Sequence, residues 1–240
     1  MKILVIIPAY NEEMNILNTI NSLKKYKDIK FDYIVINDGS TDNTLDVLHK
    51  NNINHLSLPF NMGIGAAVQA GYKYAYYNNY DIAVQFDGDG QHDITYLEKV
   101  IKPIKNDEAD MVVGSRYVED ISEFKSTFAR QMGIKLISSF IKILTKRKVY
   151  DITSGYRAIN TKILKIFAIN YPQEYPEPIT NYSLLKSGYR IKELGVKMYA
   201  RENGESSIDF FKSIYYVFNV IMSILLFNFK NYGDDFNDIK

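Results

Sequence analysis

The 240-residue chain carries 29 Lys and Arg against 28 Asp and Glu, so its net charge is +1, and 46% of it is hydrophobic. The hydrophobic fraction is normal for a globular protein, and without a basic excess we expect no nucleic-acid partner. The absence of cysteine excludes disulfides and thiolate metal sites and fits a reducing compartment. Because no signal-peptide pattern precedes the first apolar run, we expect a cytoplasmic location.

Short apolar runs alternate with helical patterns through the first half of the chain. We predict strands at 2–7, 31–38, 55–58, 82–86 and 110–114. We predict helices at 11–25, 41–50, 63–77 and 94–105, the first of them capped by Asn11. Since strands that alternate with helices form parallel sheets through right-handed crossovers, this half predicts an α/β fold with a mostly parallel sheet.

The second half of the chain is less regular. The sequence predicts a helix at 130–146 with one apolar face, and then a strand at 151–159 that Gly155 interrupts. Three prolines lie in 172–178, followed by a helix to 187 and by one strand or two short strands within 188–198.

Carboxylates gather where the predicted strand 82–86 ends. Asp87, Asp89 and Asp93 follow it, with Gly88 and Gly90 between them. Carboxylates that a tight turn aims at one point repel one another unless a cation lies between them, and hard oxygen ligands suit Mg²⁺ or Mn²⁺. The alternative is an ordinary solvated Asp-Gly turn.

Other predicted strands also end in polar residues, at 8–12, 38–42 and 115–116. The carboxyl ends of parallel strands lie at one edge of a sheet, which is where open α/β sheets bind ligands. The repetition at several strands therefore favours a ligand site over chance turn chemistry.

Several segments resemble motifs of the family 2 glycosyltransferases, and they occur in the same order. These segments are 5–12, 37–42, 61–63, 87–89, 91–92, 114–116 and 154–157. Within that family the chain is most similar to the polyprenyl-phosphate sugar synthases, and the resemblance covers residues 2–207. It implies a GT-A fold, a Rossmann-like sheet with helices on both faces, in one domain of residues 1–207.

The resemblance implies that residues 1–116 bind a nucleotide-sugar donor, linked to UDP or GDP. Tyr10 offers a flat amphipathic ring to a base or ribose, and Glu12 and Asp38 offer acceptors to hydroxyls and a base N–H. The donor-binding residues that we expect are Pro8, Tyr10, Glu12, Asp38, Gly39, Ser40, Asn61, Gly63, Asp87 and Gly88.

We expect catalytic roles for Asp89 and Arg116. Asp89 and, by resemblance, Gln91 would hold a Mg²⁺ or Mn²⁺ ion. Such an ion stabilises the negative charge that develops on a departing nucleoside diphosphate.

Residues 117–207 would hold the acceptor. Many inverting family members carry an acid near position 179 that deprotonates an acceptor hydroxyl, but this chain has Ile179 there, and Glu177 is the better candidate. A phosphate acceptor needs no base because its oxygen is already anionic. The weak base signature therefore favours a polyprenyl phosphate, and the alternative is a hydroxyl of a growing glycan with Glu177 as catalytic base.

Three further residues are candidates for binding the acceptor: Arg130, Arg201 and Ser206. Arginine suits phosphate because its planar fork makes bidentate, charge-assisted hydrogen bonds. For Arg201 the alternative is a surface ion pair with Glu202 or Glu205.

Residues 208–229 are predicted to form an amphipathic helix, followed by a polar tail at 230–240. Lys212, Tyr216, Asn219 and Ser223 recur at helical spacing as a polar stripe against an apolar face. We expect this apolar face to contact the cytoplasmic surface of a membrane or a small membrane protein partner. The alternatives are that it packs on its own domain or on a second copy in a homo-oligomer.

The sequence thus predicts an inverting, metal-dependent glycosyltransferase that moves a sugar to a polyprenyl phosphate. A nucleotidyltransferase would show a Gly-rich basic loop after the first strand, which 8–12 is not. A non-enzymatic sugar- or nucleotide-binding module would not need the acids at 87, 89 and 93.

Overall fold

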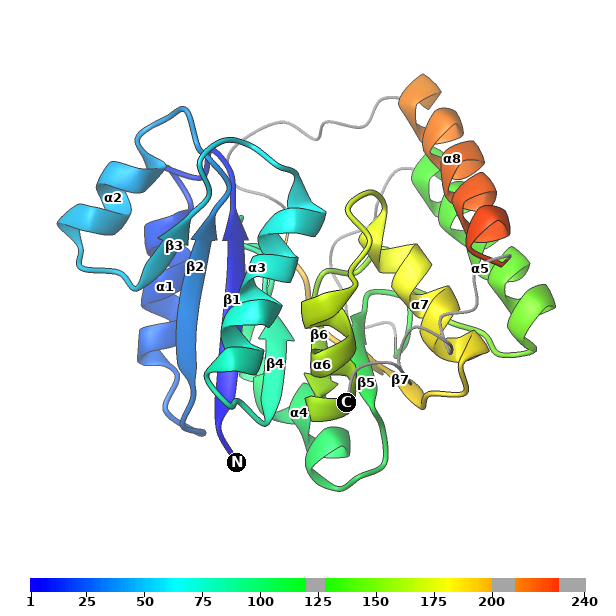
Figure 1. Ribbon diagram of the computed structural model, residues 1–240, viewed down its shortest axis with the longest axis horizontal. Coiled ribbons are helices and arrows are strands. Elements are labelled where there is room, and N and C mark those ends of the chain that lie inside the picture. The colour runs from blue at the N-terminus through cyan, green and yellow to red at the C-terminus, as the bar shows by residue number, and fades with distance from the viewer. Residues whose placement is uncertain (120–127, 200–209, 229–240) are drawn as a thin grey trace.

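The computed structural model describes residues 1–119, 128–199 and 210–228 (Figure 1). In this part of the chain a seven-stranded sheet has the order β3-β2-β1-β4-β6-β5-β7. The strands are β1 (Ile3–Ala9), β2 (Asp32–Asn37), β3 (His55–Ser57), β4 (Ile82–Gln85), β5 (Met111–Ser115), β6 (Arg157–Asn160) and β7 (Ile191–Gly195). The helices are α1 (Ile16–Lys25), α2 (Thr44–Lys50), α3 (Ile64–Tyr77), α4 (Leu97–Lys105), α5 (Phe128–Thr145), α6 (Thr161–Ile169), α7 (Pro176–Lys186) and α8 (Phe210–Asn228), with a 3₁₀ turn at Ile94–Tyr96.

The central strand β1 is apolar and β-branched because it is buried along its whole length. It pairs in parallel with β2 on one side and with β4 on the other. Their carboxyl ends therefore meet at one edge of the sheet, at the top of Figure 1. The sheet is not wholly parallel, because β6 runs antiparallel between β4 and β5.

Helices cover both faces of the sheet, as the sequence predicted. Apolar residues of α1 and α4 pack on one face, and those of α3 and α6 pack on the other. These two layers hold the strand ends in place, so the loops at the carboxyl edge start from fixed points.

Three elements of the structure differ from the prediction. The first helix begins at Ile16 rather than at Asn11, whose backbone has φ 54° and forms a turn instead of a cap. The strand predicted at 151–159 is reduced to β6, and residues before it form a loop. Helix α6 was not predicted, although the Asn160 side chain caps it by accepting from the Ile163 N–H.

Helices α5, α7 and α8 form a third apolar cluster beside the sheet, and α5 and α8 lie side by side (Figure 1). Two residues of the predicted polar stripe of α8 turn inward, since Asn219 donates to the Tyr175 hydroxyl and the ring of Tyr216 packs on that of Tyr175. The exposed side of α8 carries apolar residues, among them Phe218 and Leu226. Among the described helices none is long and apolar enough to span a membrane.

Candidate active site

A cavity of about 420 Å³ opens at the carboxyl edge of β1, β2 and β4. Its lining contains eight of the ten predicted donor-binding residues, together with Asp89: Pro8, Tyr10, Glu12, Asp38, Asn61, Gly63, Asp87 and Gly88. Ala9, Ile64 and Ala67 complete it, whereas Gly39 and Ser40 are outside the lining. The strand ends thus bring four carboxylates to one open pocket.

The Asp38 carboxylate shapes one wall of this pocket. Its two oxygens accept from the backbone N–H groups of Met62 (2.8 Å) and Gly63 (2.9 Å). Gly39 has φ 62°, and a Cβ there would overlap the backbone of Phe60, so the two loops approach closely only with glycine at 39. Asp38 is therefore a buried organiser of the 60–63 loop as well as a wall of the pocket.

The turn after β1 is held by the loop after β2. The Asn11 N–H donates to the Ser40 hydroxyl (3.0 Å), and the Asn11 side-chain oxygen accepts from the Thr41 N–H (2.8 Å). Ser40 therefore braces the pocket from outside its lining. Glu12 is buried, and its carboxylate accepts from the Asn15 amide at 2.7 Å.

Asp87 follows β4 and is fixed by a buried histidine. His92 Nε2 lies 3.0 Å from Asp87 Oδ2, and the imidazole packs against the rings of both Phe86 and Tyr156, which also contact each other. Burial works against the charged form of Asp87, but the contact with His92 outweighs it, and the pKa of Asp87 is lowered. A Cβ at Gly155 would overlap the Asp87 carboxylate, so the loop before β6 reaches the pocket only with glycine there.

The residues at the turn fit a Mg²⁺ or Mn²⁺ ion. Asp87 and Asp89 both line the pocket, and Asp89 Oδ1 accepts from the Gln91 N–H at 3.0 Å. The Gln91 amide itself donates to the Tyr199 carbonyl at 3.2 Å. The described residues contain no cluster of three or more His, Asp or Glu that could hold a metal. Mg²⁺ commonly needs only one or two carboxylates when substrate phosphates supply the other ligands.

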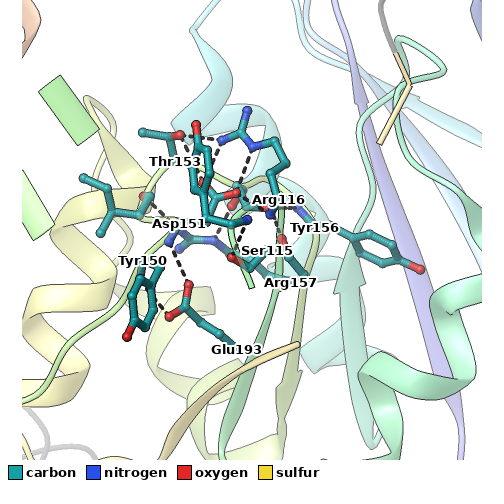
Figure 2. A network of polar contacts seen from close by, with 12 residues as sticks. Ser115, Arg116, Tyr150, Asp151, Thr153, Tyr156, Arg157 and Glu193 are labelled. Atoms are coloured by element: carbon teal, nitrogen blue, oxygen red, sulfur yellow. Dashed lines mark hydrogen bonds and ion pairs between the residues drawn. The ribbon is translucent and has the colours of Figure 1, made fainter. Parts of the chain in front are cut away.

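Arg116 follows β5 and forms a buried ion pair (Figure 2). Its Nε and Nη2 donate to the two oxygens of Asp151 at 2.8 and 2.7 Å, and Nη2 also donates to the Thr153 hydroxyl. The Asp151 carboxylate also accepts from the Arg116 N–H. Although burial opposes charge on both groups, the pairing raises the pKa of Arg116 and lowers that of Asp151.

Arg130 lies near this pair, on the first turn of α5. Burial, followed by the like charge of Arg116, lowers the pKa of Arg130. The charge of Arg116 also contributes to the low pKa of Asp87, which connects the arginine region to the donor pocket. Arg201 and Ser206 lie outside the described residues, as does the polar loop at 120–127.

Glu177 lies on the first turn of α7. Burial raises the pKa of its carboxyl, and the charge of Asp87 adds to this while Arg157 opposes it. Arg157 is fully buried and donates to neutral partners, the Ser154 carbonyl and the Thr180 hydroxyl. The charge of Asp87 thus acts on Glu177, although Glu177 is outside the lining of the 420 Å³ pocket.

A second cavity, of about 630 Å³, lies on the other side of the turn that follows β4. Asn15, at the start of α1, and Thr19 of α1 line it together with Asp89 and Tyr199. Although it is the larger of the two, its lining contains none of the ten predicted donor-binding residues. Eight of them line the 420 Å³ pocket at the strand ends, where open α/β sheets bind ligands.

Sequence reasoning missed the partners of the predicted residues. Asp151, which pairs with Arg116, lies 35 positions further along the chain. Glu193, which accepts from the backbone N–H groups of Tyr150 and Asp151, lies on an edge strand. Neither stands in a turn signature, and only the pairing of β5 with β7 brings Glu193 to this place.

The sequence profile of the family described as "Glycosyl transferase family 2" matches residues 4–167. The chain is 36% identical over 185 residues to a UDP-N-acetylglucosamine–dolichyl-phosphate N-acetylglucosaminyltransferase of Methanococcus voltae, covering 69% of this chain and 72% of that protein. It is 28% identical over 217 residues to an undecaprenyl-phosphate mannosyltransferase of Micrococcus luteus, covering 87% and 88%.

Among solved structures, the fold is similar to that of glucosyl-3-phosphoglycerate synthase from Mycobacterium tuberculosis, crystallised with Mn²⁺, UDP-glucose and phosphoglyceric acid. The TM-score is 0.70 at 20% identity, covering 94% of this chain and 79% of the other. At this identity the likeness shows the fold, which is of the GT-A type.

Proposed function

The chain belongs to glycosyl transferase family 2, and on that premise we propose that it moves a sugar from a nucleoside diphosphate to a polyprenyl phosphate. Two relatives whose names specify dolichyl phosphate or undecaprenyl phosphate as acceptor support this choice. The donor would lie in the 420 Å³ pocket, with its ribose and base against Tyr10, Glu12 and Asp38.

Asp89, assisted by Asp87, would hold a divalent cation against the diphosphate. The cation, when bound, neutralises the charge that develops on the departing nucleoside diphosphate. His92 holds the Asp87 carboxylate, and Gly88 lets the turn pack closely on the Pro8 carbonyl beneath the pocket. A single displacement at the anomeric carbon inverts its configuration.

The single observation that carries the acceptor assignment is the position of Arg116, whose charge acts both on Asp87 and on Arg130. The charge of Arg116 lowers the pKa of Asp87 and, together with burial, that of Arg130. Like charges in a partly buried place are costly, and an anion between them removes that cost. A phosphate oxygen held there is already a nucleophile and faces the donor pocket without needing a base.

The alternative acceptor is a sugar hydroxyl, with Glu177 as base, and the raised pKa of Glu177 favours it. The Glu177→Gln variant separates the two. Loss of a general base costs about 10²–10⁴-fold in rate, whereas a phosphate acceptor predicts a change of less than about tenfold. A matched control is Glu174→Gln, because Glu174 is exposed and lies in the same segment.

The helix pair α5 and α8 would rest on the membrane that carries the acceptor. Its exposed side chains include Met132 and Leu136 on α5 and Phe218, Met222 and Leu226 on α8. Exposed lysines of α5, Lys135 and Lys142, lie among them. Apolar residues beside basic ones suit an anionic membrane surface, with the site on its cytoplasmic side.

The test is transfer from radiolabelled UDP-N-acetylglucosamine, UDP-glucose and GDP-mannose to undecaprenyl phosphate, with Mn²⁺ or with EDTA. We expect one donor to give label in the organic phase and EDTA to abolish it. Label that enters a soluble glycan instead, in an assay offering both acceptors, would overturn the lipid acceptor.

A further inference from the structure

Glu193 makes a contact that neither the fold nor the donor pocket explains. It lies on β7, where Val113 of β5 is its neighbour in the parallel register. Its two carboxylate oxygens accept from two consecutive backbone N–H groups, those of Tyr150 and Asp151, each at 2.7 Å (Figure 2). One side chain thus fixes the loop that leads from α5 to β6.

That loop carries the carboxylate that holds Arg116. The Asp151 side chain is fully buried and accepts from Nε and Nη2 of Arg116, and Thr153 from the same loop accepts a further hydrogen bond from Nη2. Two parallel N–H···O bonds fix the plane of a guanidinium as well as its position. The orientation of Arg116 is therefore set by the 150–153 loop.

The pairing leaves one nitrogen of Arg116 available. A guanidinium has five N–H donors, of which Nε and Nη2 account for three. Within residues 1–119, 128–199 and 210–228 nothing accepts from Nη1. Its two N–H groups can therefore meet an anionic oxygen without breaking the contacts to Asp151.

We propose that Asp151 and Glu193 are positioning residues for the acceptor: Glu193 fixes the 150–153 loop, and Asp151 then directs Nη1 of Arg116 at the acceptor phosphate. This inference rests on the proposed function. It extends the site from the carboxyl edge of the sheet to an edge strand whose side chain does not touch the substrate. Its consequence is that a change at Glu193 affects acceptor binding only through Arg116.

The test is a double-mutant cycle between Glu193→Gln and Arg116→Ala, measured as kcat/KM for undecaprenyl phosphate. The Gln side chain has nearly the same volume as Glu, but its NH₂ group would face one of the two backbone N–H groups. One hydrogen bond is then lost, and the loop is held less firmly. Small displacements of a binding group can cost on the order of a hundredfold. We expect a loss of about ten- to hundredfold through KM, with kcat and the affinity for UDP retained.

In the Arg116→Ala background the same change should cost less than about twofold, because the residue that it positions is already absent. Glu108→Gln is the matched control, since it makes the same chemical change in a surface pair whose partner, Lys192, lies on β7 beside Glu193. That control should change kcat/KM by less than about twofold.

If Glu193→Gln fails to fold, Thr153→Val in place of Glu193→Gln gives a second cycle with Arg116→Ala, because the Thr153 hydroxyl accepts from Nη2 of Arg116 and donates to Asp151 Oδ1 in the same loop. Equal losses with and without Arg116, or a parallel loss of UDP affinity, would show a merely structural role and overturn the inference. If the wild-type chain transfers no sugar to undecaprenyl phosphate, the proposed function fails and the inference with it. Wild-type transfer with additive losses removes the inference alone.

Discussion

The charged side chains of the donor half and of the acceptor half of the site are held in different ways. In the donor half, carboxylates follow β1, β2 and β4; two backbone N–H groups hold Asp38, and His92 holds Asp87. In the acceptor half, Arg116 follows β5 and forms an ion pair with a fully buried carboxylate, that of Asp151. The first half is an open pocket, and the second is one buried ion pair held in a network of hydrogen bonds.

This difference follows from what each half would receive. A carboxylate that is to hold a cation must keep lone pairs exposed, so its partners within the protein can occupy only some of them. An arginine that is to bind phosphate can be fixed by a carboxylate along one edge, because its other edge retains donors. Four predictions test this contrast, from the largest expected effect to the smallest.

The largest effect should come from Asp151→Asn. Removing one partner of a buried ion pair leaves an uncompensated charge and costs roughly 3–5 kcal/mol. Because the pKa of folded Asp151 is lowered below its unfolded value of about 3.9, the stabilisation is complete above that pH. It is lost as the pH falls through the folded-state pKa, so urea titrations should show the full deficit at pH 7 and a smaller one at acid pH, below the unfolded value of about 3.9. An equal deficit at both pH values would argue against the ion pair.

Asp89→Ala should remove transfer while the fold remains. The residue lies in a partly exposed turn, so the urea midpoint should move little. Loss of the cation would cost several kcal/mol of transition-state stabilisation, which is at least about a hundredfold in rate. Asp93→Ala in the same turn region is the control, since its carboxylate caps Thr95 and bonds the Tyr199 hydroxyl. Activity of Asp89→Ala within a few-fold of wild type would exclude Asp89 from the metal site.

Asp38→Asn should weaken nucleotide binding by an intermediate amount. The amide would place a donor against the N–H of Met62 or Gly63, which releases the 60–63 loop. A hydrogen bond to a charged group is worth about 1.5–3 kcal/mol, so calorimetry should show UDP or GDP binding weakened by about ten- to hundredfold. Asp46→Asn, at an exposed position on α2, should leave the affinity unchanged. Equal affinities for Asp38→Asn and wild type would separate this loop from the nucleotide.

Phe218→Ser should have the smallest effect on the folded chain. The side chain is 62% exposed on α8, so stability should change by less than about 0.5 kcal/mol. Flotation with anionic liposomes should nevertheless decrease, because the helix loses apolar area. Tyr77→Ser on α3, at 76% exposure, is the matched control and should float like wild type. If both variants float equally well, α8 does not contact the membrane.

The fold could be predicted from the sequence because the patterns that indicate its strands and helices are local. Strands such as Ile3–Ala9 are continuous apolar runs, and their ends carry turn residues. The exceptions have physical reasons. Asn11 looks like a cap, but its side chain binds the 41–42 backbone and the helix starts four residues after Glu12. Polarity alone placed Asn219 outward, whereas the Tyr175 hydroxyl at the start of α7 gives it a partner on the inner side.

The position of the site could be predicted from the sequence for a different reason. Parallel strands bring their carboxyl ends together whatever the loops contain, so Glu12, Asp38 and Asp87 had to converge once the strands were recognised. The residues that orient these carboxylates could not be predicted from the sequence. The contacts between Asp87 and Gly155, and between Glu193 and the loop at 150–151, depend on the antiparallel insertion of β6, which no local pattern announces.

The most direct test of the central claim offers the enzyme two acceptors that differ only in the phosphate. Undecaprenyl phosphate and undecaprenol would be supplied together at equal concentration, with the active donor and Mn²⁺, and the labelled lipids separated by charge. If Arg116 and Arg130 bind a phosphate that attacks the anomeric carbon, all label appears in the phosphodiester product. Label on undecaprenol at a comparable rate would contradict the claim, because a hydroxyl would then be the nucleophile and Glu177 its base.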